Sequence, residues 1–463
     1  MTAKKLGVGA LTALVLSSML GAGVFSLPQN MAAVSGSEAL IIGWSITGIG
    51  ILFLATAMLY LSRLRPDLDG GIFTYAEDGF GKTIGFLSAW GYWLCAVIAN
   101  VSYLVVVFSA LSFFTDSPGH VLFGEGNTWQ SMLGASILLW VIHGLVARGV
   151  QTAASINILA TFGKLVPLAL FIVLGLLHFD YRQFSFDFSG MQLHLPVWAQ
   201  VKQTMLITLW VFIGVEGAVV VSGRAKNKED IGKATLFAVI AALSVYLLVT
   251  ILSLGIIPRD TLANMKNPSM GGLLAQMIGP YGYWIIVGGI ILSVSGAYLS
   301  WTIMAAEIPF IAAKRGAFPK LIAAQNTADA PIGSLWMTNI SVQACLIAIA
   351  FFHLDYSTLL TIASEMVLVP YLLVGLFLTK VCYQARNYSP LLIGIGATLY
   401  GLWLIYASGL TNLLMSLTLY APGLMVFLFA AWQHRQHYRL RTLDKLIILT
   451  IITSGCIIAL TTL

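Results

Sequence analysis

The chain has 463 residues, of which 59% are hydrophobic and 9% are charged, and its mean hydropathy is +0.90. Soluble globular domains carry about 25% charged residues, so this composition excludes a soluble protein and predicts an all-α polytopic membrane protein. The formal net charge of +6 is explained below by the topology, and we expect no nucleic-acid partner.

Thirteen apolar segments are long enough to cross a bilayer, which takes about 20 residues in a helix. The last of them, 443–462, is also compatible with a short interfacial helix, so we expect about 12–13 transmembrane helices. In chain order the segments lie near 7–33, 38–61, 83–113, 130–147, 154–177, 203–222, 233–257, 283–312, 333–352, 357–380, 390–409, 411–432 and 443–462.

Basic residues are distributed unequally between the two sides of this topology. If the N-terminus is cytoplasmic, 19 of the 24 Lys and Arg residues lie in or beside cytoplasmic loops. Only Arg182, Lys202, Arg259 and Lys266 lie on the outer side, and Lys164 lies within a span. Positively charged loops stay in the cytoplasm, so this asymmetry sets the orientation and accounts for the high pI.

Two spans contain glycines at their own midpoints. These are Met19-Leu20-Gly21-Ala22-Gly23-Val24-Phe25-Ser26-Leu27-Pro28 in the first span and Trp210-Val211-Phe212-Ile213-Gly214-Val215-Glu216-Gly217 in the sixth. Glycine disfavours helix by about 1 kcal/mol relative to alanine, and Pro28 removes a further helical hydrogen bond. Unwound backbone at membrane depth persists only where it is buried in protein or lines a cavity. A Gly-x-Gly helix-packing patch is the alternative explanation for the first span alone.

Interrupted spans in corresponding positions of two repeats indicate the substrate site of a secondary transporter. Spans one and six correspond if the first ten spans form two five-helix halves, about 7–177 and about 203–380. The helices in 390–463 would then be additional, within a single transmembrane domain covering 1–463. The amides at the start of the half-helix after the first break would suit a carboxylate.

Four ionisable residues lie within the predicted spans, where a charge costs at least about 2.5–3.5 kcal/mol. Glu216 lies at the second break and is the strongest functional candidate. Glu307 lies near a span end, where a capping or snorkelling role is equally consistent. Glu365 lies deeper in its span. Lys164 lies mid-span, and its alternative role is a structural pair with a carboxylate.

Aromatic residues lie mid-span beside the breaks, and rings of this kind can hold a guanidinium or ammonium group by cation–π contact. Trp210 opens the second break, Trp301 lies within the eighth span, and Tyr92 and Trp93 precede Asn100 in the third. Simple packing is the alternative role for each. We find no catalytic constellation, and four scattered cysteines indicate neither a disulfide framework nor a metal site. We therefore expect no cofactor and no enzymatic activity.

These motifs resemble the amino acid–polyamine–organocation (APC) superfamily, and within it the basic amino acid/polyamine antiporter family, closest to the arginine/ornithine antiporters. The resemblance covers spans one to ten. It rests on Gly21-Ala22-Gly23-Val24-Phe25-Ser26-Leu27-Pro28, Tyr92-Trp93 with Asn100, Leu209–Glu216, Gly316-Ala317-Phe318-Pro319 and Leu368-Val369-Pro370-Tyr371.

The resemblance implies a LeuT-like fold of inverted five-helix repeats, with broken helices 1 and 6 around the site. It implies that backbone amides at Ala22 and Gly23 hold the substrate carboxylate and that carbonyls near Trp210 and Ile213 hold the α-ammonium. It also implies substrate contacts from a larger set: Met19, Tyr92, Asn100, Glu216, Trp301, Ser364 and Glu365.

The resemblance further implies gating roles for Trp210 and Glu216. Lys164 resembles the fifth-span lysine of proton-coupled relatives, whose ammonium takes the place of a sodium ion. The chain departs from the family at Ala22, where a serine is usual, so a hydroxyl contact is lost. It also departs at Glu365, where the arginine/agmatine exchangers are apolar, and an extra carboxylate there would favour a cationic substrate.

We therefore expect a transporter of the bacterial inner membrane that exchanges arginine for ornithine, with lysine as a further candidate substrate. The lipid bilayer is its expected surrounding, and a homodimer is left open. Proton-coupled uptake through Lys164 or a glutamate is the alternative mechanism. A non-transporting amino acid sensor of the same fold is the alternative class, although no signalling domain accompanies the spans.

Overall fold

The computed structural model describes residues 7–21, 23–68, 71–148, 153–220, 226–352, 356–434 and 440–462. Regular structure in these ranges is helical, and one isolated β-bridge joins Ser117 and His120. This agrees with the all-α class predicted from composition.

The long helices fall where hydropathy places the spans. The first span is formed by α1 (Val8–Met19) with α2 (Gly23–Val34), and the sixth by α9 (Val197–Phe212) with α10 (Gly217–Val220). The other long helices are α3 (Ser37–Leu64), α5 (Lys82–Thr115), α6 (Trp129–Ala147), α7 (Ala153–His178), α11 (Lys228–Ile256), α14 (Tyr281–Lys314), α15 (Ile332–Phe352), α16 (Tyr356–Gln384), α17 (Tyr388–Ser408), α18 (Leu410–Gln433) and α19 (Thr442–Thr462).

Within the described ranges, eleven helices are long and apolar enough to cross a membrane, and the bent pair of α1 and α2 makes a twelfth candidate. With 26 residues, α7 occupies the range expected for the fifth span. The 21 residues of α19 include a 19-residue candidate span, so the thirteenth segment is a full-length helix rather than a short one. The chain is thus a multi-pass membrane protein.

Short helices connect the spans at both ends of the bundle. Because Gly71 and Gly81 flank it with positive φ angles, α4 (Ile72–Phe80) is a separate helix, and it packs against α5 and α16. The others are α8 (Tyr181–Phe186), α12 (Arg259–Ala263), α13 (Ser269–Ile278) and two 3₁₀ turns at Met191–Leu193 and Lys320–Ala323.

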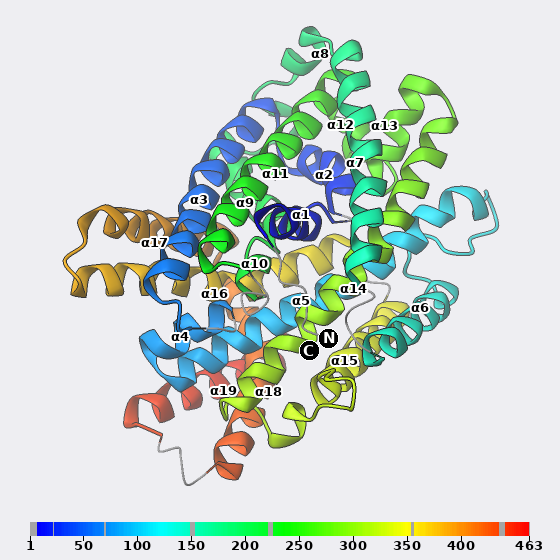
Figure 1. Ribbon diagram of the computed structural model, residues 1–463. Helices are drawn as coiled ribbons and strands as arrows, with labels where there is room; N and C mark the ends of the chain where they lie inside the picture. The colour runs from blue at the N-terminus through cyan, green and yellow to red at the C-terminus, as the bar shows by residue number, and fades with distance from the viewer. Residues whose placement is uncertain are drawn as a thin grey trace.

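The two broken spans lie in the interior of the bundle. Figure 1 shows α1 and α2 near the centre of the molecule, with α17 towards one side and α6 and α15 towards the other. The most buried of the candidate spans is α5, which packs against α14 and α16, whereas α6 and α19 are largely exposed. A helix that is apolar on all sides suits this central position.

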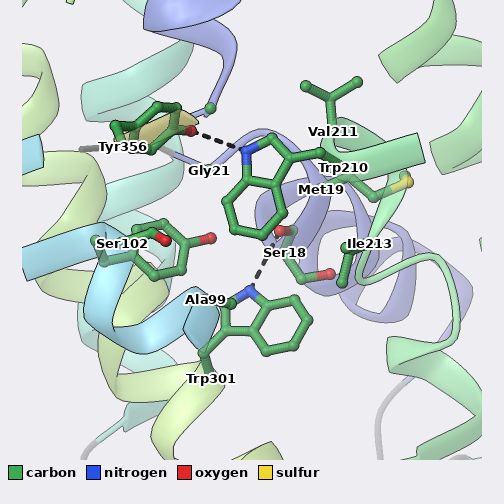
Figure 2. Close-up of a pocket in the computed structure, with 12 residues that line it drawn as sticks. Ser18, Met19, Gly21, Ala99, Ser102, Trp210, Val211, Ile213, Trp301 and Tyr356 are labelled. Atoms are coloured by element: carbon green, nitrogen blue, oxygen red, sulfur yellow. Dashed lines mark hydrogen bonds between the residues drawn. The ribbon is translucent and has the colours of Figure 1, made fainter. Parts of the chain in front are cut away.

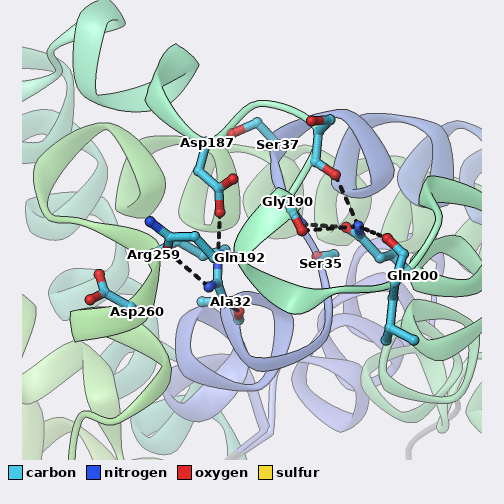
Figure 3. A network of polar contacts seen from close by, with 12 residues as sticks. Ala32, Ser35, Ser37, Asp187, Gly190, Gln192, Gln200, Arg259 and Asp260 are labelled. Atoms are coloured by element: carbon cyan, nitrogen blue, oxygen red, sulfur yellow. Dashed lines mark hydrogen bonds and ion pairs between the residues drawn. The ribbon is translucent and has the colours of Figure 1, made fainter.

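One end of the broken first span is tied to the loops around it (Figure 3). Arg259 pairs with Asp187 at 3.0 Å and donates to the Ala32 carbonyl oxygen near the end of α2, also at 3.0 Å. Gln200, at the start of α9, accepts from the Gly36 amide at 2.9 Å in the turn between α2 and α3. These contacts join α2 to α9 and α12.

A second set of ion pairs lies at the opposite end of α3. Arg65, which follows α3, bonds Asp78 at 2.6 Å, and Arg315, which follows α14, bonds Glu77 at 3.1 Å. Both carboxylates belong to α4. The short helix therefore connects the ends of two long helices from different parts of the chain.

The loop after α5 is organised by Asp116. Its carboxylate accepts hydrogen bonds from the amides of Leu122, Phe123 and Gly124 at 2.8–3.1 Å. Burial opposes ionisation of this carboxyl, but the three amides outweigh it and hold the pKa of Asp116 below its ordinary value of 3.8. The ionised form therefore stabilises the loop.

Candidate functional site

The first break separates α1 from α2 over three residues and bends the span by 45°. The helical pattern stops at Leu20, whose ψ of 58° is not helical, and the Gly21 amide turns back to the Met19 carbonyl at 2.7 Å. Gly21 also meets a tertiary requirement, because a Cβ there would overlap the Tyr103 hydroxyl and lie 2.9 Å from the ring carbon Cζ. The glycine identified from the sequence thus allows both the turn and this close approach.

Side chains from three other helices bond the carbonyl oxygens at the end of α1. The last carbonyls of a helix have no intrahelical partner, and no water reaches them within a bilayer. The donors come from α7, α14 and α11: Lys164 Nζ to Ser17 O at 2.7 Å, Trp301 Nε1 to Ser18 O at 3.3 Å, and the Tyr246 hydroxyl to Met19 O at 2.8 Å. The unwound segment is therefore held by the surrounding bundle.

The second break lies directly against the first. Its Gly214 has a φ of +108°, which disfavours any residue with a Cβ. A Cβ at Gly214 would also lie 2.9 Å from Ser18 Oγ, which donates to the Gly214 carbonyl at 3.0 Å. Tyr246 joins the two breaks again, since its hydroxyl also lies 2.6 Å from the Val211 carbonyl oxygen.

Glu216 is fully buried behind the second break. Its carboxylate accepts from the Tyr92 hydroxyl, from the Tyr371 hydroxyl at 2.6 Å and from the Gly214 amide at 3.2 Å. A carboxylate accepts several hydrogen bonds at once, and here the donors come from α5, α16 and the break itself. Glu216 therefore links the unwound segment to two helices outside it.

A small cavity lies between the two breaks, as Figure 2 shows. Trp210 Nε1 donates to the Tyr356 hydroxyl at 2.8 Å across one wall, while Trp301 forms another wall. The described residues that line it are Ser18, Met19, Gly21, Gly23, Ala99, Ser102, Tyr103, Trp210, Val211, Ile213, Trp301 and Tyr356.

Five of the residues predicted for the site line this cavity: Met19, Gly23, Trp210, Ile213 and Trp301. Ala22 lies outside the described residues. The backbone segments and the two tryptophans named from the sequence are therefore brought together, although they come from spans one, six and eight.

Five other predicted residues are not among the described residues that line the cavity: Tyr92, Asn100, Glu216, Ser364 and Glu365. Asn100 is fully buried, and its amide has no hydrogen-bond partner among the described residues. Ser364 bonds the Leu206 carbonyl at 3.0 Å and so ties α16 to α9. Glu365 is 8% exposed, and in the described structure its Oε1 is buried without a partner. Their substrate contacts remain predictions.

The sequence analysis missed three tyrosines at the site. Tyr103 and Tyr356 line the cavity, and Tyr246 bonds both breaks. Each lies within or at the end of an apolar span, where an aromatic residue is ordinary, so only tertiary structure shows its role. The sole signal was the position of Tyr246 in the middle of its span, away from the interface where tyrosine is usual.

The cavity combines a helix N-terminus with aromatic and uncharged walls. Its described lining residues include neither a carboxylate nor an ammonium group. The first turn of α2 begins at Gly23, and its free amides favour an anionic group. The indole faces of Trp210 and Trp301 can accept a cation. Among the described residues, no group of His, Cys, Asp and Glu could hold a metal ion.

Comparison with known proteins gives extensive matches. A family model for amino acid permeases matches residues 6–459. A protein of Escherichia coli strain K12 named "Putative arginine/ornithine antiporter" is 66% identical over 431 residues, which are 93% of each chain. An arginine/ornithine antiporter of Pseudomonas aeruginosa is 42% identical, covering 99% of this chain and 97% of the relative. An arginine/agmatine antiporter of Chlamydia pneumoniae is 41% identical, covering 93% and 90%.

Proposed function

This chain belongs to the amino acid permease family, and from that membership we propose that it exchanges cationic amino acids across the bacterial inner membrane, arginine for ornithine. It is a transporter and not an enzyme. The observation that carries the substrate proposal is the cavity between the two breaks, which offers helix amides at one side and aromatic faces around it.

Each part of an arginine or ornithine molecule has a matching group in this arrangement. The α-carboxylate suits the amides at the start of α2, and the α-ammonium suits the carbonyl oxygens of the second break near Ile213. The guanidinium or side-chain ammonium suits the faces of Trp301 and Trp210, a contact worth about 0.5–2 kcal/mol. Lysine fits the same description and is a further candidate.

Alternating access would open the cavity to each side in turn. Trp210 and Tyr356 meet across one wall, so we propose that their contact separates to admit substrate. Glu216 with its two tyrosine partners follows the second break along the chain, and we propose that this cluster opens in the other half of the cycle. The N-terminus would be cytoplasmic, as the positive-inside rule requires.

The decisive experiment is counterflow in proteoliposomes. Vesicles loaded with ornithine should take up labelled arginine much faster than empty vesicles, because obligatory exchange needs a substrate on both sides. Equal uptake by empty vesicles under a proton gradient would instead support proton-coupled uptake through Lys164. A protein that binds arginine without moving it would be a sensor, and a strict sodium requirement would contradict both transport mechanisms.

A matched pair of tryptophans on α14 tests the location of the site. Trp301 lines the cavity, whereas Trp284 is 63% exposed and stacks on Phe114 at a ring distance of 4.0 Å. Trp301→Leu should lower arginine affinity, and Trp284→Leu should leave it close to wild type. Equal effects of the two substitutions would place the site elsewhere.

Glu365 is proposed to contribute to the preference for cationic substrates from outside the cavity wall. A buried carboxylate attracts a cation over several ångströms because the surrounding dielectric is low. Glu365→Gln should shift the preference from arginine towards neutral amino acids. Unchanged selectivity between arginine and a neutral amino acid would remove this role.

A homodimer remains part of the proposal, to be tested by light scattering of the purified protein.

A further inference from the structure

Tyr103 lies against the unwound backbone of the first break. The side chain is 7% exposed and lines the cavity together with Ser102 and Ala99 of the same helix, α5. Its hydroxyl approaches Gly21 so closely that a Cβ at that position would overlap the oxygen. Tyr103 therefore presents a hydroxyl to Gly21, just after the end of α1.

Gly23, at the start of α2, also lies beside polar groups. A Cβ at Gly23 would lie 2.8 Å from Trp210 Nε1 and 3.4 Å from the Tyr356 hydroxyl. The Trp210 N–H is already used, because it donates to Tyr356 at 2.8 Å. The hydroxyl groups of Tyr103 and Tyr356 thus lie close to Gly21 and Gly23, respectively.

The two half-helices differ in what they leave available to a ligand. The carbonyl oxygens that end α1 already accept from Lys164, Trp301 and Tyr246. The amides of the first turn of α2 have no helical acceptor, and this end carries the partial positive charge of the helix dipole. The part of the cavity beside Tyr103 is therefore suited to an anion, which in an amino acid is the α-carboxylate.

We infer that Tyr103 is a specificity-determining residue whose hydroxyl donates a hydrogen bond to the α-carboxylate of the substrate. It makes the carrier prefer amino acids to the amines formed from them by decarboxylation. This inference rests on the proposed function and deepens it. The relatives include both arginine/ornithine and arginine/agmatine antiporters, and agmatine is arginine without its carboxylate.

The inference separates two kinds of selectivity. Arginine and ornithine share the carboxylate and differ at the far end of the side chain, so loss of the Tyr103 hydroxyl should weaken both equally. Agmatine offers no carboxylate, so its binding should not depend on this hydroxyl. Hydrogen bonds to charged groups are strong enough to change affinity by about 10- to 100-fold.

The test measures the affinities of the purified full chain for arginine, ornithine and agmatine by calorimetry. In Tyr103→Phe, the Kd values for arginine and ornithine should rise together by about 10- to 100-fold, while the Kd for agmatine stays within about threefold. The arginine-to-agmatine preference of the wild type should therefore shrink, and the arginine-to-ornithine ratio should stay constant.

Tyr356→Phe is the matched control, since it removes the other tyrosine hydroxyl of the cavity. That hydroxyl accepts from Trp210 and belongs to the contact proposed to open. We expect Tyr356→Phe to change all three affinities by similar factors. If Tyr356→Phe and not Tyr103→Phe changes the arginine-to-agmatine ratio, the assignment to Tyr103 is wrong.

An equal loss for all three ligands in Tyr103→Phe would make the residue a packing partner of Gly21 and overturn the inference. Unchanged affinities would overturn it as well. Should Tyr103→Phe fail to give a monodisperse protein, Tyr103→Met is measured against the same ratio with the same criteria. A wild-type protein that binds neither arginine nor ornithine would contradict the proposed function itself. If the wild type binds both and Tyr103→Phe leaves the arginine-to-agmatine affinity ratio unchanged, only the role of Tyr103 is contradicted.

Discussion

Replacement of Lys164 tests whether the end of α1 must be held for exchange. Its ammonium lies 2.7 Å from the Ser17 carbonyl oxygen and 3.0 Å from Ser17 Oγ, and the side chain is fully buried. Lys164→Gln removes the charge, and its shorter side chain does not reach as far. The end of α1 loses the donor that joins it to α7.

The size of the effect follows from these two contacts. A hydrogen bond to a charged group contributes about 1.5–3 kcal/mol, and here one ammonium is shared by both acceptors. Without the ammonium, the buried Ser17 carbonyl oxygen loses this donor, and a buried acceptor left without its partner costs about 1–3 kcal/mol. A loss of about 2 kcal/mol would lower the equilibrium constant for docking α1 on α7 by about 30-fold.

We expect Lys164→Gln to bind arginine within about threefold of wild type, because Lys164 does not line the cavity. Its counterflow exchange should be at least about tenfold slower, since returning to the docked state becomes harder. Lys202→Gln is the control, because Lys202 lies near the start of α9, 4.5 Å from the Tyr406 ring and at the other end of the helix from the second break. Wild-type exchange by Lys164→Gln would refute the reasoning, and failure to fold would make the contact purely structural.

Three further predictions concern other parts of the structure. Glu216→Gln puts an amide N–H₂ opposite two tyrosine hydroxyl donors. The lost hydrogen bond to a charged group is worth about 1.5–3 kcal/mol, so counterflow exchange should slow by about tenfold or more. A normal exchange rate would exclude a gating role. Trp301→Leu should weaken arginine binding by about 2- to 30-fold, whereas Trp210→Leu should mainly lower the exchange rate. Calorimetry and exchange assays measure the two effects, and two neutral variants would place the substrate site elsewhere. Asp116→Asn should lower the free energy of unfolding by about 1 kcal/mol at pH 7. Because the folded pKa of Asp116 lies below 3.8, its stabilisation is present above that value and is lost as the pH falls through the folded pKa. The difference in Tm between wild type and Asp116→Asn should therefore shrink below about pH 4, and a difference independent of pH would contradict this account.

Hydropathy predicted the helical segments because a span must be apolar along its whole length. Two helices begin earlier than predicted: α9 at Val197 rather than near residue 203, and α11 at Lys228 rather than near residue 233. Gln200 and Lys202 resemble loop residues in the sequence. In the fold, however, Gln200 is buried and bonds backbone groups of three neighbouring segments, and Lys202 lies over an aromatic ring. Tertiary contacts thus allow polar residues inside the helix.

The breaks were predictable because glycine acts on the local backbone, and local effects are visible in a sequence. The partners of the breaks were not, since Tyr246 lies more than 200 residues from Met19 along the chain and meets it only through packing. The sequence analysis named Asn100 for the substrate site, and the structure places its neighbour Ala99 in the cavity lining, so the substrate contact of Asn100 stays a prediction. On a helix, adjacent residues point about 100° apart, so a register of one residue decides which side chain lines the cavity.

The uncharged wall of the cavity has an electrical consequence. Because its described lining residues carry no carboxylate or ammonium to neutralise a bound cation, the charge of the substrate itself crosses the membrane field. Moving one elementary charge through 100 mV changes the free energy by about 2.3 kcal/mol. Exchange of arginine for ornithine, both of charge +1, would then be indifferent to the membrane potential. Exchange of arginine for a neutral amino acid or for a dication would carry current, so voltage alone could set the direction of such traffic.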